Sequence, residues 1–244
     1  MKNDIVKLKI KNHWPAILLA AVLGFLMILP FLYFQAALGD EYKGIQNQVI
    51  DDELFYLARI KDVMDGHQTL GNAYLWEHKE KPPQQIFLPE WLLAQPLKLL
   101  NFETFKFLNV SIIQGRMFYG FIFPVLAFVL TYAAFYFIYP SRLWSNLFAV
   151  FLFFGLYLFK FTRPVIPQFV FIFWLTQFIF LWLLIKDKRN DIMIYHSAPK
   201  KWILLLSILN FGFLFYLYPF YWTFYSVFLA VLAAIYFFKE RPLS

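Results

Sequence analysis

Six runs of apolar residues, each close to the length that crosses the hydrocarbon core of a membrane, limit what this chain can fold into. A helix needs about 20 such residues to span the core. The runs cover residues 14–35, 117–139, 143–159, 166–185, 202–217 and 220–238. The sequence therefore predicts an all-α polytopic membrane protein, a single transmembrane domain over residues 1–244 with about six transmembrane helices.

The composition fits a protein whose apolar surface is covered by membrane lipid. Apolar residues make up 61% of the chain, and 33 of its 244 residues are phenylalanine, whereas soluble domains are about 45–50% apolar. The chain has no cysteine, which excludes disulfides and thiolate chemistry. It also has no Walker A motif, no glycine-rich dinucleotide fingerprint and no serine-centred elbow, so an ATP-driven pump is not supported.

The net charge of +7 is distributed unevenly along the chain. If both termini lie inside, the inner side holds 12 of the 22 basic residues but four of the 15 acidic ones. The positive-inside rule expects this asymmetry, so the basic excess indicates topology rather than nucleic-acid binding. We expect an integral plasma (inner) membrane protein with both termini in the cytoplasm.

Parts of this assignment have alternatives. The runs 143–159 and 202–217 are short and could be tilted or re-entrant. Pro219 either breaks the helix between the last two runs or kinks one long helix. The first run could be a cleaved signal peptide, but its length and its Pro30 favour a retained anchor, since the apolar part of a signal peptide has about 7–15 residues.

Residues 37–115 form the first external loop, which is much longer than a connector and is expected to contain short amphipathic helices. Helical periodicity over residues 51–65 predicts one of them, and Gly66 is its expected C-terminal stop. Its predicted apolar side consists of Leu54, Leu57, Ile60, Val63 and Met64.

A second helix is predicted at residues 86–100, an apolar stretch that Pro89 and Pro96 interrupt. Two alternatives stay open for it: a helix that lies on the outer leaflet, or one that packs on the membrane spans.

Three adjacent carboxylates, Asp51, Asp52 and Glu53, stand at the head of the first loop helix and are the main candidates for chemistry. Helix capping explains one carboxylate well and three poorly. An acid at this place could take a proton from an acceptor hydroxyl as a sugar or phosphate leaves a lipid carrier. Paired acids could also hold a divalent cation, Mg²⁺ or Mn²⁺.

The stretch DDELFY, in a long external loop after one membrane span, resembles the GT-C superfamily of integral membrane glycosyltransferases. Asp52-Glu53 followed by Tyr56 is similar to the D-E-x-x-Y pattern of the aminoarabinose transferases that modify lipid A, and the Asp-Glu pair resembles protein O-mannosyltransferases. The resemblance implies inverting transfer of a sugar from a polyprenyl-phosphate carrier to an external acceptor. It implies Asp52 as the catalytic residue, Glu53 as its partner and Tyr56 at the substrate; Asp51 leaves the register open by one residue.

A short external loop at residues 159–168 supplies two cations, Lys160 and Arg163, on the same face as the acids. Because arginine can grip a phosphate with two parallel bonds, Arg163 is a candidate to stabilise the leaving group, with Lys160 beside it. The alternative is an arginine that reaches to lipid headgroups. The loop has no second acidic motif, which argues against a metal requirement.

Other charged residues are weaker candidates. Arg59 could pair with Asp62 or contact a substrate phosphate, although a solvated position is the favoured interpretation, and Arg116 is similar.

Two rival functions remain: a transporter or lipid flippase, and a non-catalytic membrane assembly subunit. A transporter usually places polar groups inside its spans, where this chain has mainly Gln177 and Asn210. GT-C enzymes usually have more helices and often a soluble C-terminal domain. We therefore expect this chain to be a fragment, a truncated product or one part of an enzyme with a partner subunit.

Overall fold

The computed structural model describes residues 12–43, 52–67, 87–100, 111–157, 163–185 and 200–240, and every regular element in them is helical. The all-α prediction is therefore confirmed for these residues. The elements are α2 (Trp14–Leu38), η1 (Gly39–Glu41), α3 (Asp52–Met64), α4 (Leu88–Leu100), α5 (Ile112–Ile138), α6 (Arg142–Leu152), η4 (Phe153–Tyr157), η5 (Pro164–Phe169), α7 (Val170–Ile185), α8 (Lys200–Leu217) and α9 (Pro219–Glu240).

Four helices are long and apolar enough to cross a membrane. They cover Trp14–Glu41, Ile112–Ile138, Val165–Ile185 and Lys200–Leu217. Two further apolar helices in the described part of the chain, Arg142–Gly155 and Pro219–Ile235, are shorter than a full span. The structure thus contains four candidate membrane-spanning helices, and the predicted total of six stays a prediction.

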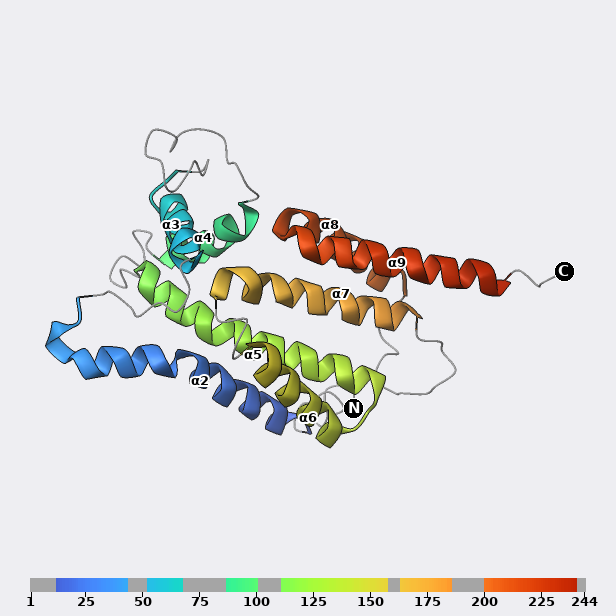
Figure 1. The fold of residues 1–244 in the computed structure, drawn as a ribbon, viewed down its shortest axis with the longest axis horizontal. Coiled ribbons are helices and arrows are strands. Elements are labelled where there is room, and N and C mark those ends of the chain that lie inside the picture. The colour runs from blue at the N-terminus through green and yellow to red at the C-terminus, as the bar shows by residue number, and fades with distance from the viewer. Residues whose placement is uncertain are drawn as a thin grey trace, which may run out of the picture.

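The long helices lie side by side, and the short helices α3 and α4 lie at one end of the bundle (Figure 1). The helix α2 runs toward this end and α5 runs away from it. Of the last three helices, α7 runs away from this end, α8 runs toward it and α9 runs away again. Direct contacts join α3 to α4 and α5, and α4 to η5 and α8. The end of the bundle that carries α3 and α4, called the α3/α4 end below, therefore gathers segments that are far apart in the sequence.

Small residues allow α2 to pack closely on α5. Ala16, Ala20 and Gly24 are buried on one face of α2, at spacings of four residues that place them on one side of a helix. A methyl group at Gly24 would lie 2.9 Å from the backbone oxygen of Phe121. The opposite face of α2 carries large exposed apolar side chains, which suits a surface covered by lipid.

The predicted third span is short. α6 ends after 11 residues and continues as a π-helical turn, η4. The buried residues of α6 are Ser145 and Ala149, and α6 packs on α5. Small residues thus lie on the buried side of this helix as well.

The last two apolar runs are separate helices, so the alternative of one kinked helix is wrong. The two helices α8 and α9 fold back on each other at Tyr218 (Figure 1), and the rings of Phe215 and Trp222 stack across the turn with centroids 4.4 Å apart. Pro219 is the first residue of α9, where the N–H that proline lacks would have no helical partner.

The predicted loop helix is confirmed as α3, and Gly66 ends it. Gly66 has φ of +101°, and the N–H of His67 donates to the carbonyl of Asp62 at 3.0 Å. Leu57, Ile60 and Val63 of the predicted apolar side are buried. Leu54 does not share this buried side, so its place in the predicted apolar side is wrong. It is exposed, while the charged residues Glu53 and Arg59 are buried.

α4 is packed on the other helices, and its prolines do not interrupt it. Pro89 lies in the first turn, where the missing N–H costs nothing. Pro96 lies inside the helix, and just before it the side-chain amide of Gln95 donates to the carbonyl of Trp91 at 3.0 Å. The hydroxyl of Tyr119 on α5 donates to the carbonyl of Leu93 at 2.6 Å, which ties α4 to the bundle.

Candidate functional site

Three arginine–carboxylate pairs join α3 to three other elements at the α3/α4 end. Asp52 pairs with Arg163, which precedes η5. Glu53 pairs with Arg116 on α5. The third pair reverses the charges, since Arg59 of α3 meets Glu90 of α4. Together they place the motif residues relative to the membrane helices.

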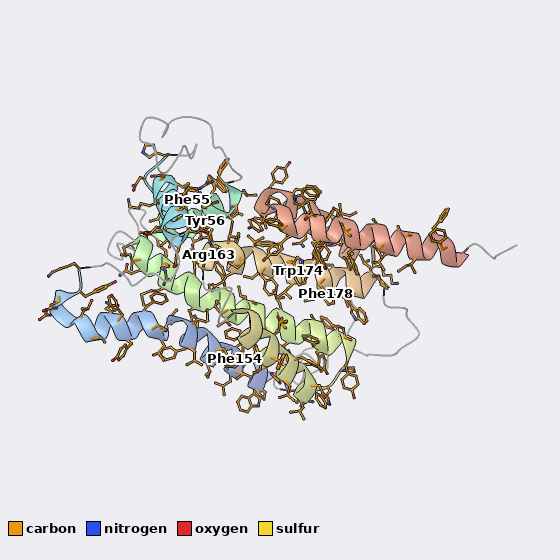
Figure 2. All side chains as sticks on the ribbon, in the orientation of Figure 1. Phe55, Tyr56, Phe154, Arg163, Trp174 and Phe178 are labelled. Atoms are coloured by element: carbon orange, nitrogen blue, oxygen red, sulfur yellow. The ribbon has the colours of Figure 1, made fainter. Side chains whose placement is uncertain are left out.

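The pair of Asp52 and Arg163 is the accessible one. Arg163 Nη1 donates to Asp52 Oδ2 at 2.7 Å, and the side chains are 66% exposed for Asp52 and 20% exposed for Arg163. The guanidinium carbon lies 5.9 Å from the ring centre of Tyr56, and Figure 2 shows Arg163 next to Tyr56 below α3. Asp52 and Tyr56 are one helical turn apart on the same face, so a single arginine contacts both ends of the motif.

A buried turn presents Arg163. Val165 and Ile166 of η5 are buried, and the N–H of Gln168 donates to the Arg163 carbonyl at 3.3 Å. Arg163 Nε is itself buried and has no hydrogen-bond partner among the described residues. The guanidinium therefore keeps unused donor capacity on a fixed backbone.

Tyr56 is half-buried between the arginine and an aromatic neighbourhood. It packs in one apolar cluster with Trp91 of α4 and Tyr218 of the α8–α9 turn. Burial raises the pKa of the Tyr56 hydroxyl, and the charge of Arg163 opposes part of that rise. Tyr56 therefore stays a neutral hydroxyl at physiological pH.

Glu53 faces a different neighbour from Asp52, because successive residues of an α-helix are turned by about 100°. Arg116 Nε lies 2.5 Å from Glu53 Oε1, and the two side chains are 4% and 5% exposed. The Arg116 guanidinium carbon also lies 3.7 Å from the ring centre of Phe31 on α2. The interpretation of Arg116 as a solvated residue is therefore wrong. The predicted catalytic role of Glu53 stays untested, and its carboxylate is held in a buried pair.

Arg59 is buried too, so its favoured solvated position is wrong. Its Nε lies 3.0 Å from Glu90 Oε1, and its guanidinium carbon lies 5.1 Å from the ring centre of Phe55. Burial raises the pKa of Glu90, which the charge of Arg59 partly offsets. A contact between Arg59 and a substrate phosphate finds no support in this arrangement. The sequence analysis did not identify Glu90 as the partner of a buried arginine, although Glu90 is the one acid in the apolar stretch 86–100.

Two predicted site residues, Asp51 and Lys160, lie outside the described residues. Within the part of the chain that the structure describes, no group of three or more histidine, aspartate or glutamate residues could hold a metal ion. Asp52 and Glu53 each bind an arginine. The possible Mg²⁺ or Mn²⁺ therefore gains no supporting geometry.

Gln177 and Asn210, the two polar residues predicted inside the spans, are hydrogen-bonded to each other. Gln177 Nε2 donates to Ser207 Oγ at 2.9 Å, and Asn210 Nδ2 donates to Gln177 Oε1 at 3.0 Å. These bonds join α7 to α8, and interhelical bonds of this kind stabilise helix pairs in membranes.

Comparisons of the chain with protein-family models, with curated proteins and with solved structures find no match.

Proposed function

We propose that this chain is a membrane glycosyltransferase that moves a sugar from a polyprenyl-phosphate carrier to an acceptor hydroxyl. The observation that supports the proposal best is the Asp52–Arg163 pair beside Tyr56 at the end of a bundle of apolar helices. The D-E-x-x-Y resemblance to GT-C enzymes supplies the reaction class. The α3/α4 end would face the outside, with both termini in the cytoplasm.

The reaction needs a base at the acceptor hydroxyl and positive charge at the leaving phosphate. The acceptor oxygen attacks the anomeric carbon, and the bond from that carbon to the phosphate oxygen breaks with its electrons on the phosphate. Asp52 takes the proton from the acceptor hydroxyl. Arg163 stabilises the negative charge that develops on the leaving polyprenyl phosphate. A single displacement of this kind inverts the anomeric centre.

The guanidinium has enough donors for both partners. It carries five N–H bonds, and Asp52 takes one of them through Nη1. The buried Nε lacks a partner among the described residues, so a phosphate oxygen that reached it would satisfy an otherwise unpaired group. Arg163 thus joins the base and the leaving group in one hydrogen-bonded unit.

The lipid carrier also explains why such a site belongs at the end of apolar helices. A polyprenyl chain stays in the hydrocarbon core and presents its phosphate at the membrane surface. A flippase could also bind the carrier phosphate, but neither a transporter nor an assembly subunit would need a base there, so turnover separates the three functions.

The test is turnover by the full chain in membranes that contain acceptors. Radiolabelled polyprenyl-phosphate sugars are added, and released polyprenyl phosphate is measured, since every sugar yields this product. Asp52→Asn should lower the rate about 10²–10⁴-fold, the usual contribution of a general base. Asp65→Asn is the matched control, because Asp65 directly follows α3 and pairs only with exposed Lys61 in the described residues.

Three outcomes would contradict this assignment. Full activity of Asp52→Asn together with loss in Asp51→Asn would move the base by one residue. Release that none of these substitutions affects would remove the acids from the chemistry. Movement of intact carrier across the membrane without release would favour a flippase.

A further inference from the structure

We infer that Glu53 and Arg116 are positioning residues, whose buried pair fixes the rotation of α3 so that Asp52 and Tyr56 face Arg163. The catalytic consequence of this inference rests on the proposed function. Its structural consequence, the placement of α3, does not.

The start of α3 needs such a device because it offers adjacent acids. Asp52 and Glu53 differ by about 100° around the helix. A rotation of α3 by one residue would present Glu53 to Arg163 and turn Asp52 away. The carboxylates alone do not distinguish the two settings, since either one can accept the arginine bond. Their environments do, because Asp52 is largely exposed whereas Glu53 is 5% exposed.

Arg116 is held rigidly enough to define the setting. It lies early in α5, which begins with a capping box formed by Ser111 and Gln114. The neighbouring Gly115 approaches Leu97 of α4 so closely that a methyl group there would lie 2.6 Å from a Leu97 side-chain carbon. Phe31 covers the guanidinium at 3.7 Å. The carboxylate of Glu53 therefore meets a cation whose position three helices determine.

A buried charge without its partner is strongly unfavourable. Any rotation of α3 that separates Glu53 from Arg116 would leave two such charges. The Arg59–Glu90 pair adds a second fixed point, nearly two turns further along α3 and on a different neighbour. With both pairs intact, α3 has a single orientation, which places Asp52 and Tyr56 at Arg163.

Two roles for Glu53 make opposite predictions for a charge swap. A catalytic Glu53 needs a carboxylate at position 53. A positioning Glu53 needs only a complementary pair, so Glu53→Arg/Arg116→Glu should recover what Glu53→Gln loses.

The first measurement follows the position of α3 without any substrate. The chain has no cysteine, so spin labels can be placed on cysteines that replace Lys61 of α3 and Phe118 of α5, both exposed. Pulsed electron paramagnetic resonance measures the distance between the two labels. It should give one narrow distance distribution in the chain that carries both labels and no other substitution. The distribution should broaden or shift in Glu53→Gln and narrow again in the swap. An unchanged distribution in Glu53→Gln, or no recovery in a folded swap, would overturn the inference. If Glu53→Gln does not fold, Arg116→Lys takes its place with the same two outcomes, because it keeps the charge and loses the guanidinium fork.

The second measurement uses release of polyprenyl phosphate from the sugar-loaded carrier. Misplacement of a catalytic group by about 1 Å can cost about 10²-fold, so Glu53→Gln should lower kcat by about that factor with a smaller effect on KM. The kcat of the charge-swap variant should be at least about tenfold higher than that of Glu53→Gln. An inactive swap with a parent-like distance distribution would show that the carboxylate of Glu53 takes part in the chemistry and would overturn the inference. Full activity of both Asp52→Asn and Asp51→Asn would overturn the proposed function alone, because the distance measurement does not depend on turnover.

Discussion

The three arginines that meet α3 differ in what a substrate can reach. Arg59 and Arg116 are buried with their carboxylates, and exchanging a partner there would leave a buried charge unpaired. Arg163 binds a carboxylate that is mostly exposed, so water weakens this pair more than the two buried ones. The proposed function therefore assigns the phosphate to Arg163 and not to the two buried arginines. At this scale the structure separates one partly exposed pair from two buried pairs.

The grip of Arg163 on the phosphate can be tested by binding. Arg163→Lys keeps the charge but loses the planar fork and the contact with Tyr56. A hydrogen bond to a charged group is worth about 1.5–3 kcal/mol, so the affinity for polyprenyl phosphate in nanodiscs should fall at least about tenfold. Arg163→Ala should weaken binding further. Arg142→Lys is the control, since Arg142 is exposed at the start of α6, at the other end of the bundle. Unchanged affinity in both Arg163 variants would contradict phosphate binding and would support the alternative that Arg163 only reaches to lipid headgroups.

Among the elements, the contact of α2 with α5 depends on small residues. At Gly24 an added methyl group would lie 2.5 Å from Val125 Cγ2 and 2.9 Å from the Phe121 backbone oxygen. Gly24→Ala should therefore destabilise the bundle by about 1–3 kcal/mol, the usual cost of overpacking. The midpoint of unfolding by SDS in mixed micelles measures it. Gly212→Ala on α8 is the control, because no atom lies within 4 Å of its added methyl group, and helix propensity favours alanine by up to about 1 kcal/mol. Equal effects of the two substitutions would contradict close packing at Gly24.

The elements that local signals define could be predicted, and the pairs between elements could not. The periodicity and Gly66 gave α3 its extent because both act within one helix. The partner of Glu53 is 63 residues away and that of Asp52 is 111 residues away, so only the packing of α3 on η5 and α5 identifies them. The exposure of Leu54 has the same origin, since the ion pairs, and not the apolar residues alone, set the rotation of α3.

On the scale of the whole molecule, the arginines at the two ends of the bundle have different surroundings within the part of the chain that the structure describes. At the α3/α4 end, Arg59, Arg116 and Arg163 each bind a carboxylate. At the opposite end, Arg142, Lys200 and Lys201 have no carboxylate partner among the described residues. Positive charge near helix ends favours the cytoplasmic side, and a paired arginine contributes little to that bias. The structure therefore adds to the sequence count a reason why these three arginines of the α3/α4 end need not oppose an outward orientation.

This orientation can be measured with single cysteines in the cysteine-free chain. Lys61 on α3 and Lys200 at the start of α8 are both exposed, and they lie at opposite ends of the bundle. An impermeant maleimide added to intact cells should label Lys61→Cys and leave Lys200→Cys unlabelled, while permeabilised cells should show both. The unsubstituted chain controls for background, because it has no thiol. Labelling of Lys200→Cys alone in intact cells would place the site in the cytoplasm. A cytoplasmic site would rule out transfer at the external face, while the pairing of Asp52 with Arg163 would still permit phosphate chemistry on the inner side.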